Sequence, residues 1–290
     1  MIKKIYKYFY IIQEKYLFRQ SHNTLSPIDI LIPATYKDFL LLPHVVNHAI
    51  KNIQHKISHI FIIIPHGTEI CRELQHLNNI YFIDEDIFNI NRQLFNDYII
   101  TVNKENPAQT KKIDRRGWLL QQFIKLSGDK LCEEEKFLVL DSDTVLVKKQ
   151  AFESMGKDIL LFSDEYHKPY YDCFERIFGY KPVDTLSFVS HHMLFEKKFL
   201  SELKNEIESK NGKDWITSII SHCDFTNPSC FSEYETYGHW MLKNNSSKII
   251  RQYFFNYSLS RKSIENIDSI INRNKMLKSI SLHSYIDEYE

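Results

Sequence analysis

The sequence of 290 residues is poor in glycine and proline, with 7 glycines and 8 prolines. It lacks an apolar run of the roughly 18 to 20 residues that span a bilayer. The scarcity of glycine and proline, with no repeat and no low-complexity block, argues against a linker between separate domains. No signal-peptide pattern is found at the N-terminus, so export by that route is not expected. One continuous domain in the cytoplasm is therefore predicted.

Charge and cysteine content are equally unbiased. Lys plus Arg and Asp plus Glu number 37 each, so no global field attracts nucleic acid, and we expect no nucleic-acid partner. The five cysteines are odd in number and form no C-x-x-C pair, which argues against a disulfide framework or a structural zinc site. A reducing cytoplasm fits this usage.

Positive charge is concentrated locally at the N-terminus. Residues 1–20 hold five Lys or Arg against one Glu, interleaved with aromatic and aliphatic residues. We predict a basic, aromatic helix over residues 1–24. Such a helix can lie on an anionic membrane surface as a peripheral contact, or it can pack on the domain.

Short apolar runs alternate with helical patterns in the first half of the chain. Runs at 28–32, 60–64, 80–83 and 137–140 are separated by helical patterns around 43–53, 69–77 and 117–126. This alternation predicts βαβ units and an α/β fold with a mixed, mainly parallel sheet flanked by helices. The second half is less regular, with strands expected at 159–162 and 193–195 and helices at 196–208, 215–221 and 236–244.

Two carboxylates directly follow the fourth apolar run, as Asp141-Ser142-Asp143. Ligands bind outside the carboxyl ends of strands in open α/β sheets, which is where this triplet is expected. Paired carboxylates suit Mn²⁺ or Mg²⁺, which leave coordination positions for a diphosphate. Roughly one Asp-x-Asp is expected by chance, and Asp84-Glu85-Asp86 is a second one. The mid-chain position between two apolar strands favours Asp141 and Asp143.

Two other interpretations of this part of the sequence remain open. A haloacid-dehalogenase-type phosphatase would use Asp141 as nucleophile, Asp143 as the acid for the leaving group and Ser163 for the phosphate. Its motif normally lies near the N-terminus, and no downstream acidic pair completes its metal site. A non-catalytic carbohydrate-binding protein would keep the fold but would not need the two carboxylates.

Five segments together resemble the bacterial cell-surface polysaccharide glycosyltransferases of the GT-A fold, in particular the DUF6492-like group. They are residues 28–33, 116–126, 137–147, 188–193 and 231–238. The resemblance implies one GT-A catalytic domain with a Rossmann-like sheet over residues 25–290, divided into a donor-nucleotide half (25–147) and an acceptor half (148–290).

The resemblance also implies an activity. The expected reaction is metal-dependent transfer of a hexose, with inversion favoured, from a nucleotide sugar to a glycan or lipid-linked saccharide. A UDP-sugar is the expected donor. The expected pathway is synthesis of lipopolysaccharide O-antigen or capsule at the inner face of the bacterial membrane.

Six residues are then expected to bind the donor. Pro33 and Thr35 receive the nucleotide after the first strand, and Asp84 is either a base or ribose contact or a solvated loop acid. Arg116 begins a helix, where its charge would add to backbone N–H groups suited to a diphosphate, although a plain surface arginine is an equal alternative. Gln122 and Ser142 complete this set.

The acceptor is expected to meet two histidines and two glutamates. His191 and His192 precede a strand in which side chains alternate faces, so only one can point into the cleft. Glu233 and Glu235 are two residues apart on a helix and cannot share a face. We predict Glu233 as the general base of an inverting displacement and Glu235 as a substrate contact, with a helix-terminal charge as the alternative for Glu233.

A third metal ligand is implied near the C-terminus. Many metal-dependent GT-A enzymes use a histidine there, and His283 is the one histidine that follows His239. The alternative is an ordinary core or surface histidine. The predicted metal set is therefore Asp141, Asp143 and His283.

Overall fold

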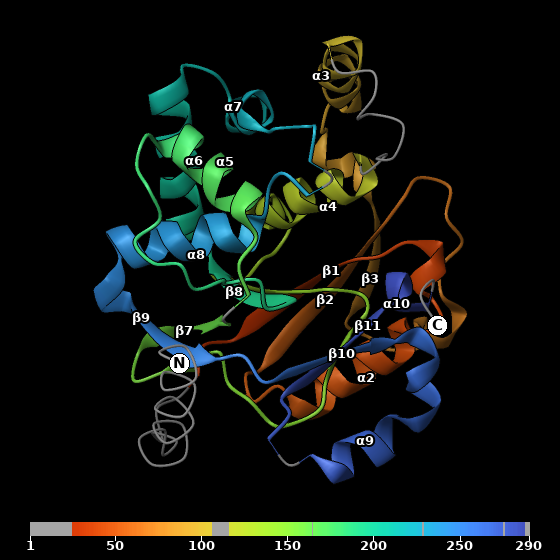
Figure 1. Cartoon of the computed structure of the whole chain (residues 1–290). Helices are drawn as coiled ribbons and strands as arrows, with labels where there is room; N and C mark the ends of the chain where they lie inside the picture. The colour runs from red at the N-terminus through yellow and green to blue at the C-terminus, as the bar shows by residue number, and fades with distance from the viewer. Residues whose placement is uncertain (1–24, 106–115, 164, 228, 275, 288–290) are drawn as a thin grey trace.

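The computed structural model describes residues 25–105, 116–163, 165–227, 229–274 and 276–287 (Figure 1). The helix predicted at 1–24, and with it the membrane contact through residues 1–20, lies outside the described residues. Within the described part of the chain, no helix is both long and apolar enough to cross a membrane.

A mixed five-stranded sheet forms the centre of the molecule, as the sequence predicted. Its order is β3 (Ile80–Asp84), β2 (Ile57–Ile64), β1 (Ile28–Pro33), β4 (Lys136–Leu140) and β8 (His192–Glu196). The first four strands are parallel, and β8 runs antiparallel to β4. β1, β4 and the second half of β2 are buried on both faces, which explains their continuous apolar runs, whereas β3 at the edge of the sheet is partly exposed.

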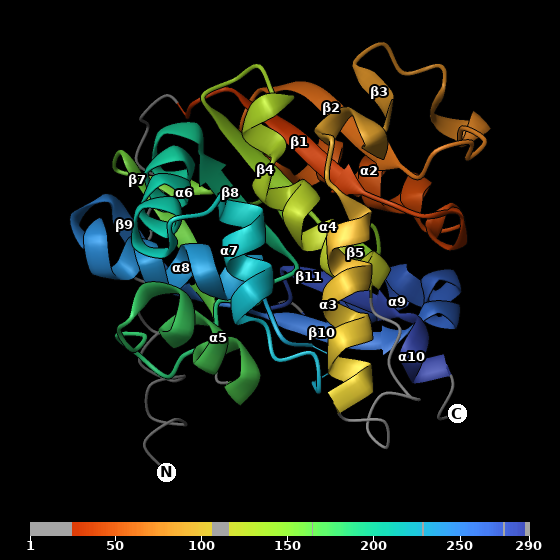
Figure 2. The ribbon, with the colours of Figure 1, turned by 90° about the horizontal axis from the view of Figure 1, so that it is seen from above.

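Alternate side chains of each strand enter two separate cores. Ile30 and Ile32 pack toward α2 (Leu42–Asn52), whereas Leu31 packs on the opposite face, in the same core as Phe123. That second face is covered by α4 (Arg116–Leu126), α5 (Lys168–Phe178), α6 (Lys197–Asn211), α7 (Trp215–His222) and α8 (Glu233–Asn244) (Figures 1 and 2). α3 (Arg92–Glu105) lies beside α4 and α7 in Figure 2.

Two three-stranded sheets complete the fold. One consists of β10 (Asn256–Ser260), β11 (Ser279–His283) and β5 (Thr144–Leu146), and the other of β6 (Glu153–Ser154), β7 (Lys157–Phe162) and β9 (Ile249–Tyr253). β11 is antiparallel to β5, and the Leu282 amide donates to the Asp143 carbonyl at 2.8 Å. This pairing brings the C-terminal strand, followed by α10 (Ser284–Asp287), against the Asp-Ser-Asp segment.

The helix predicted at 69–77 is wrong. The segment contains one 3₁₀ turn, Arg72–Leu74, with no side-chain cap at its start. Only Cys71 and Leu74 are buried there, so a single turn uses all the apolar contact that the segment offers. α8 begins three residues before the helical pattern at 236–244, at the helix start expected from the placing of Glu233 and Glu235 on a helix, because the Ser232 hydroxyl accepts the Glu235 amide and caps it. α3, α5, α9 (Ile267–Arg273) and β9 to β11 were not predicted.

Candidate active site

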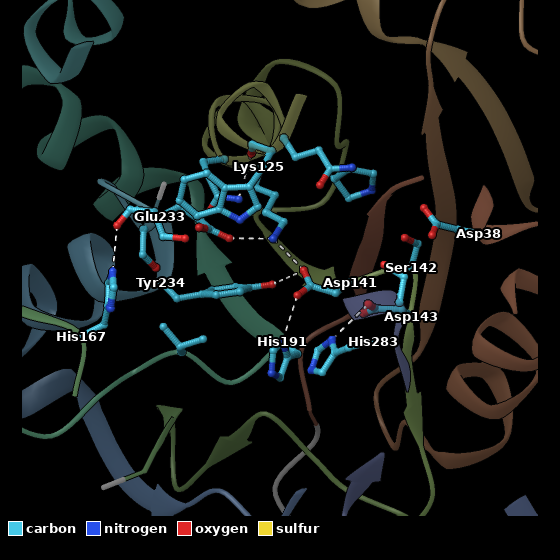
Figure 3. A pocket seen from close by; sticks show the side chains of 18 of the residues that line it. Asp38, Lys125, Asp141, Ser142, Asp143, His167, His191, Glu233, Tyr234 and His283 are labelled. Carbon is cyan, nitrogen blue, oxygen red and sulfur yellow. Dashed lines mark hydrogen bonds and ion pairs between the residues drawn. The ribbon is translucent and has the colours of Figure 1, made fainter. Parts of the chain in front are cut away.

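A cavity of about 430 Å³ opens where β4 ends (Figure 3). Asp141, Ser142 and Asp143 all line it. Figure 3 shows Asp38, Asp143 and His283 on one side of Asp141, and His167, Glu233 and Tyr234 on the other. The lining also includes Pro33, Lys37, Trp118, Gln121, Gln122, Lys125, Tyr170, Arg261 and Ser284. The cavity thus lies at the carboxyl ends of β1 and β4, where an open α/β sheet is expected to bind its ligand.

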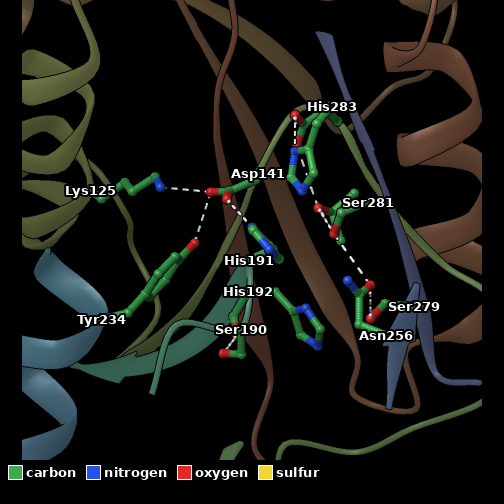
Figure 4. Close-up of polar contacts among 12 residues, drawn as sticks. Lys125, Asp141, Ser190, His191, His192, Tyr234, Asn256, Ser279, Ser281 and His283 are labelled. Atoms are coloured by element: carbon green, nitrogen blue, oxygen red, sulfur yellow. Dashed lines mark hydrogen bonds and ion pairs between the residues drawn. The ribbon is translucent and has the colours of Figure 1, made fainter. Parts of the chain in front are cut away.

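Asp141 is held by three side chains on its two oxygens (Figure 4). Its Oδ1 accepts Lys125 Nζ at 2.6 Å and the Tyr234 hydroxyl at 2.9 Å, and its Oδ2 accepts His191 Nδ1 at 3.2 Å. Burial alone would raise the pKa of Asp141, but Lys125 and His191 outweigh it and lower the pKa below its usual value. Asp141 is therefore ionised.

Lys125 is a functional residue that the sequence analysis missed. Its ammonium lies 2.6 Å from Asp141 and 2.8 Å from Glu233, and its side chain is 7 % exposed. Burial opposes its charge, yet the two carboxylates raise the pKa of Lys125 above its usual value. A lysine within the apolar run Phe123-Ile-Lys-Leu126 was the available signal, because a buried cation needs a partner.

Asp143 and His283 are neighbours in the cavity although they lie 140 residues apart in the sequence. His283 ends β11, and its Nδ1 lies 3.3 Å from Asp143 Oδ2. The His283 and His191 rings are also neighbours, with centroids 5.0 Å apart. Two carboxylates, Asp141 and Asp143, and the imidazole of His283 from a distant strand therefore line one cavity.

The chemistry of this set fits a divalent cation. An ionised carboxylate offers about four lone-pair positions, and Asp141 uses three of them for Lys125, Tyr234 and His191. Asp143 and His283 would then be the main ligands, with the remaining position of Asp141 beside them. His66, Asp84 and Asp86 form another group: among the residues described, they alone place three ligand atoms within 4.8 Å of one another, and they are exposed or half-buried outside the cavity.

Of the two predicted glutamates, only Glu233 faces the cavity. It begins α8, its side chain is fully buried, and burial raises its pKa while Lys125 opposes the shift. Glu235 points into the core, where it accepts the Ser187 hydroxyl at 2.6 Å and the Phe188 amide at 2.9 Å. Glu235 therefore does not line the cavity that was expected to hold the substrate.

Of the two predicted histidines, likewise, only His191 faces the cavity. His191 lines the cavity, and its backbone carbonyl accepts the Asp141 amide at 2.9 Å. It has a φ of 58°, a left-handed conformation that is uncommon for histidine and turns the chain into β8. His192 is fully buried against Phe152 and Phe254, and burial lowers its pKa to about 3. His192 is thus a core residue.

The predicted donor residues divide into two groups. Pro33, Gln122 and Ser142 line the cavity. Thr35 lies beside it, where its hydroxyl donates to Asp38 at 3.0 Å. Arg261, which the sequence analysis missed, is held there by Asp38 at 2.6 Å and supplies a cation to this wall.

The other predicted polar residues lie away from the cavity. Asp84 pairs with His66 at 2.7 Å, and Arg116 donates to Asn96 at 2.8 Å. Ser163, which the phosphatase interpretation requires near Asp141, does not line the cavity either; its amide donates to the carbonyl of Ser187.

Comparisons with known proteins give a family and a distant structural likeness. The model of a family of unknown function, DUF6492, matches residues 34–288. No curated protein matches the chain. It is similar to the crystal structure of the galactosyltransferase LgtC with donor and acceptor sugar analogs (13% identity, TM-score 0.44) and to that of an LgtC active-site mutant (12%, 0.45). Each likeness covers 88% of this chain and 87% of the other, and assigns no activity by itself. The family match extends over most of the sequence, and the chain belongs to the DUF6492 family.

Proposed function

We propose that this protein is a GT-A glycosyltransferase that moves a sugar from a nucleotide sugar to a hydroxyl group of a saccharide, using Mn²⁺ or Mg²⁺. The observation that carries the proposal is the convergence of Asp141, Asp143 and His283 in one cavity at the end of β4. Carboxylate oxygens and an imidazole nitrogen are ligand types that suit a divalent cation, which can also bind a diphosphate.

The donor is proposed to lie on the side of the cavity next to β1. Pro33 and Ser142 line that side, and Lys37 and Arg261 supply positive charge near it. Cationic side chains suit the phosphates of a nucleoside diphosphate. When bound, the divalent cation would offset the charge that develops on the leaving diphosphate.

Glu233 is proposed as the general base. The acceptor oxygen attacks the anomeric carbon, the bond to the diphosphate breaks, and the acceptor proton passes to Glu233. General-base catalysis of this kind contributes about 10² to 10⁴-fold. Lys125 holds Glu233 and Asp141 in register, since its ammonium contacts both carboxylates. Burial raises the pKa of Glu233, which makes it a stronger base than an exposed glutamate.

The finer expectations also belong to this proposal. They are a UDP-sugar donor, hexose transfer with inversion, a glycan or lipid-linked acceptor, and a cytoplasmic role in bacterial lipopolysaccharide or capsule synthesis. They are supported by the resemblance of the five sequence segments.

A melting-temperature panel tests the proposal. UDP, GDP, CDP and ADP are each added with and without Mn²⁺. Ligand at 100 times its Kd stabilises the fold by about 2.7 kcal/mol, so one nucleotide should raise the melting temperature by a few degrees, and only with Mn²⁺. No shift with any nucleotide, or turnover of p-nitrophenyl phosphate in place of nucleotide sugars, contradicts the proposal.

A further inference from the structure

We propose that the cavity wall formed by Trp118, His167 and Tyr170, called here the aromatic wall, binds a pyranose ring of the acceptor. The identification of this sugar as the acceptor rests on the proposed function. The wall itself is a carbohydrate-binding surface that can be tested without turnover.

Two of the three rings of the wall, those of Trp118 and Tyr170, come from different helices. Trp118 belongs to the first turn of α4 and Tyr170 to the first turn of α5, and both line the cavity. Their rings are nearly parallel, at 17°, with centroids 6.4 Å apart. Both rings are half-buried, so each keeps apolar surface that a ligand in the cavity can contact.

The orientation of Tyr170 is fixed by His167. The two rings meet edge to face with centroids 4.4 Å apart, and His167 Nε2 donates to the carbonyl of Ser229 at 2.9 Å. The Tyr170 amide in turn donates to the His167 carbonyl at 3.0 Å. Because the wall is held in place before a ligand arrives, little conformational entropy is lost on binding.

A pyranose matches the chemistry of this wall. Its C–H face is apolar and packs on aromatic rings, while its rim carries hydroxyl groups that need hydrogen-bond partners. Gln121, Glu165 and Ser229 line the cavity beside the rings and offer donors and acceptors. Ligand sites commonly combine apolar and aromatic surface with a few polar groups in this way.

The position of the wall favours the acceptor over a nucleobase. Figure 3 shows His167 on the side of Glu233 and Tyr234, whereas Asp38, Asp143 and His283 lie on the other side of Asp141. His167, which contacts Tyr170, thus places the wall on the side of the proposed base, away from Asp38 and its partner Arg261. A sugar held there presents a hydroxyl group toward Glu233.

The test is saturation-transfer NMR on the full chain with methyl pyranosides of glucose, galactose, mannose and N-acetylglucosamine. At least one glycoside should give a signal. Trp118→Leu and Tyr170→Leu should each lower the affinity for that glycoside by about tenfold, because the flat ring is lost. Trp118→Phe and Tyr170→Phe keep a flat ring and should keep most of the signal. Tyr81→Leu, at a half-exposed tyrosine on β3 outside the cavity, is the matched control and should change nothing.

Nucleotide binding is measured on the same variants, by the Mn²⁺-dependent melting shift with UDP, GDP and CDP. The wall predicts an unchanged shift in both leucine variants. The inference is overturned if no glycoside gives a ring-dependent signal, or if the leucine variants weaken nucleotide binding. Ring-dependent glycoside binding without release of nucleotide from any nucleotide sugar would refute the transferase and leave the wall established as a carbohydrate site.

Discussion

Replacing Lys125 with methionine should strongly destabilise the protein. The methionine side chain has a similar length but no charge, so Asp141 and Glu233 lose their shared cation. Asp141 keeps Tyr234 and His191, whereas Lys125 is the one side chain found to pair with the fully buried Glu233 carboxylate among the described residues. Removing one partner of a buried ion pair costs about 3 to 5 kcal/mol.

The loss should fall mainly on Glu233, which a second substitution can show. Lys125→Met combined with Glu233→Gln removes both charges, and the two changes should couple by about 1 to 3 kcal/mol. Lys204→Met is the matched control: Lys204 is also largely buried but bonds a single carboxylate, Asp129, at 2.7 Å. Asp129 is about one-fifth exposed and can be rehydrated, so this variant should lose less stability.

The assay is urea unfolding followed by circular dichroism, with the free energy of unfolding extrapolated to water. The expected order of destabilisation is Lys125→Met first, then the double variant, then Lys204→Met. A loss below about 1 kcal/mol in Lys125→Met, or no coupling with Glu233→Gln, would refute the buried three-charge arrangement.

Three further predictions follow from single side chains. Glu233→Gln should reduce sugar transfer by about 10² to 10⁴-fold while nucleotide binding stays intact, measured by product release and by melting shift; loss of both would assign Glu233 another role. Glu235→Gln should lower the free energy of unfolding by about 1.5 to 3 kcal/mol without changing nucleotide affinity, because its carboxylate bonds the Ser187 hydroxyl and a backbone amide in the core. Burial raises the pKa of Asp158 from 3.8 to about 6 despite Lys136, so its ionisation opposes folding, and its contribution to stability is lost as pH rises from about 4 to about 6. In urea unfolding, the free energy of unfolding should fall between pH 4 and 7 by about 1 to 3 kcal/mol less in Asp158→Asn than in the unsubstituted protein. An equal fall in both proteins would contradict the prediction.

The sequence predicted those parts of the fold that depend on local pattern. The apolar runs of β1, β2 and β4 are buried on both faces and therefore stand out, and the alternation with helices correctly indicated a mainly parallel sheet. The place of Asp141 at a strand end also followed from local pattern, because β4 is continuous up to Leu140. The segment at 69–77 misled because a spacing of three between Cys71 and Leu74 suits a single 3₁₀ turn as well as a helix.

The parts of the fold and site that the sequence did not predict depend on contacts between distant segments. β10 and β11 are short and partly polar, and they form strands by pairing with each other and with β5. Because local sequence patterns do not reveal this pairing, they could not predict that Arg261 contacts Asp38. Arg116 was expected to bind phosphate from its place at a helix start, but the side chain turns to Asn96. Sequence spacing gives a residue's place on an element, whereas its neighbours set its direction.

The catalytic cation is proposed to bind in the cavity with Asp143 and His283. This proposal is tested by Mn²⁺-dependent release of UDP from UDP-glucose, UDP-galactose and UDP-N-acetylglucosamine. Asp143→Asn and His283→Gln should each reduce the release by at least about 100-fold. Asp86→Asn, in the exposed group with His66 and Asp84, should leave the rate unchanged. Full activity in Asp143→Asn together with loss of activity in Asp86→Asn would contradict the account.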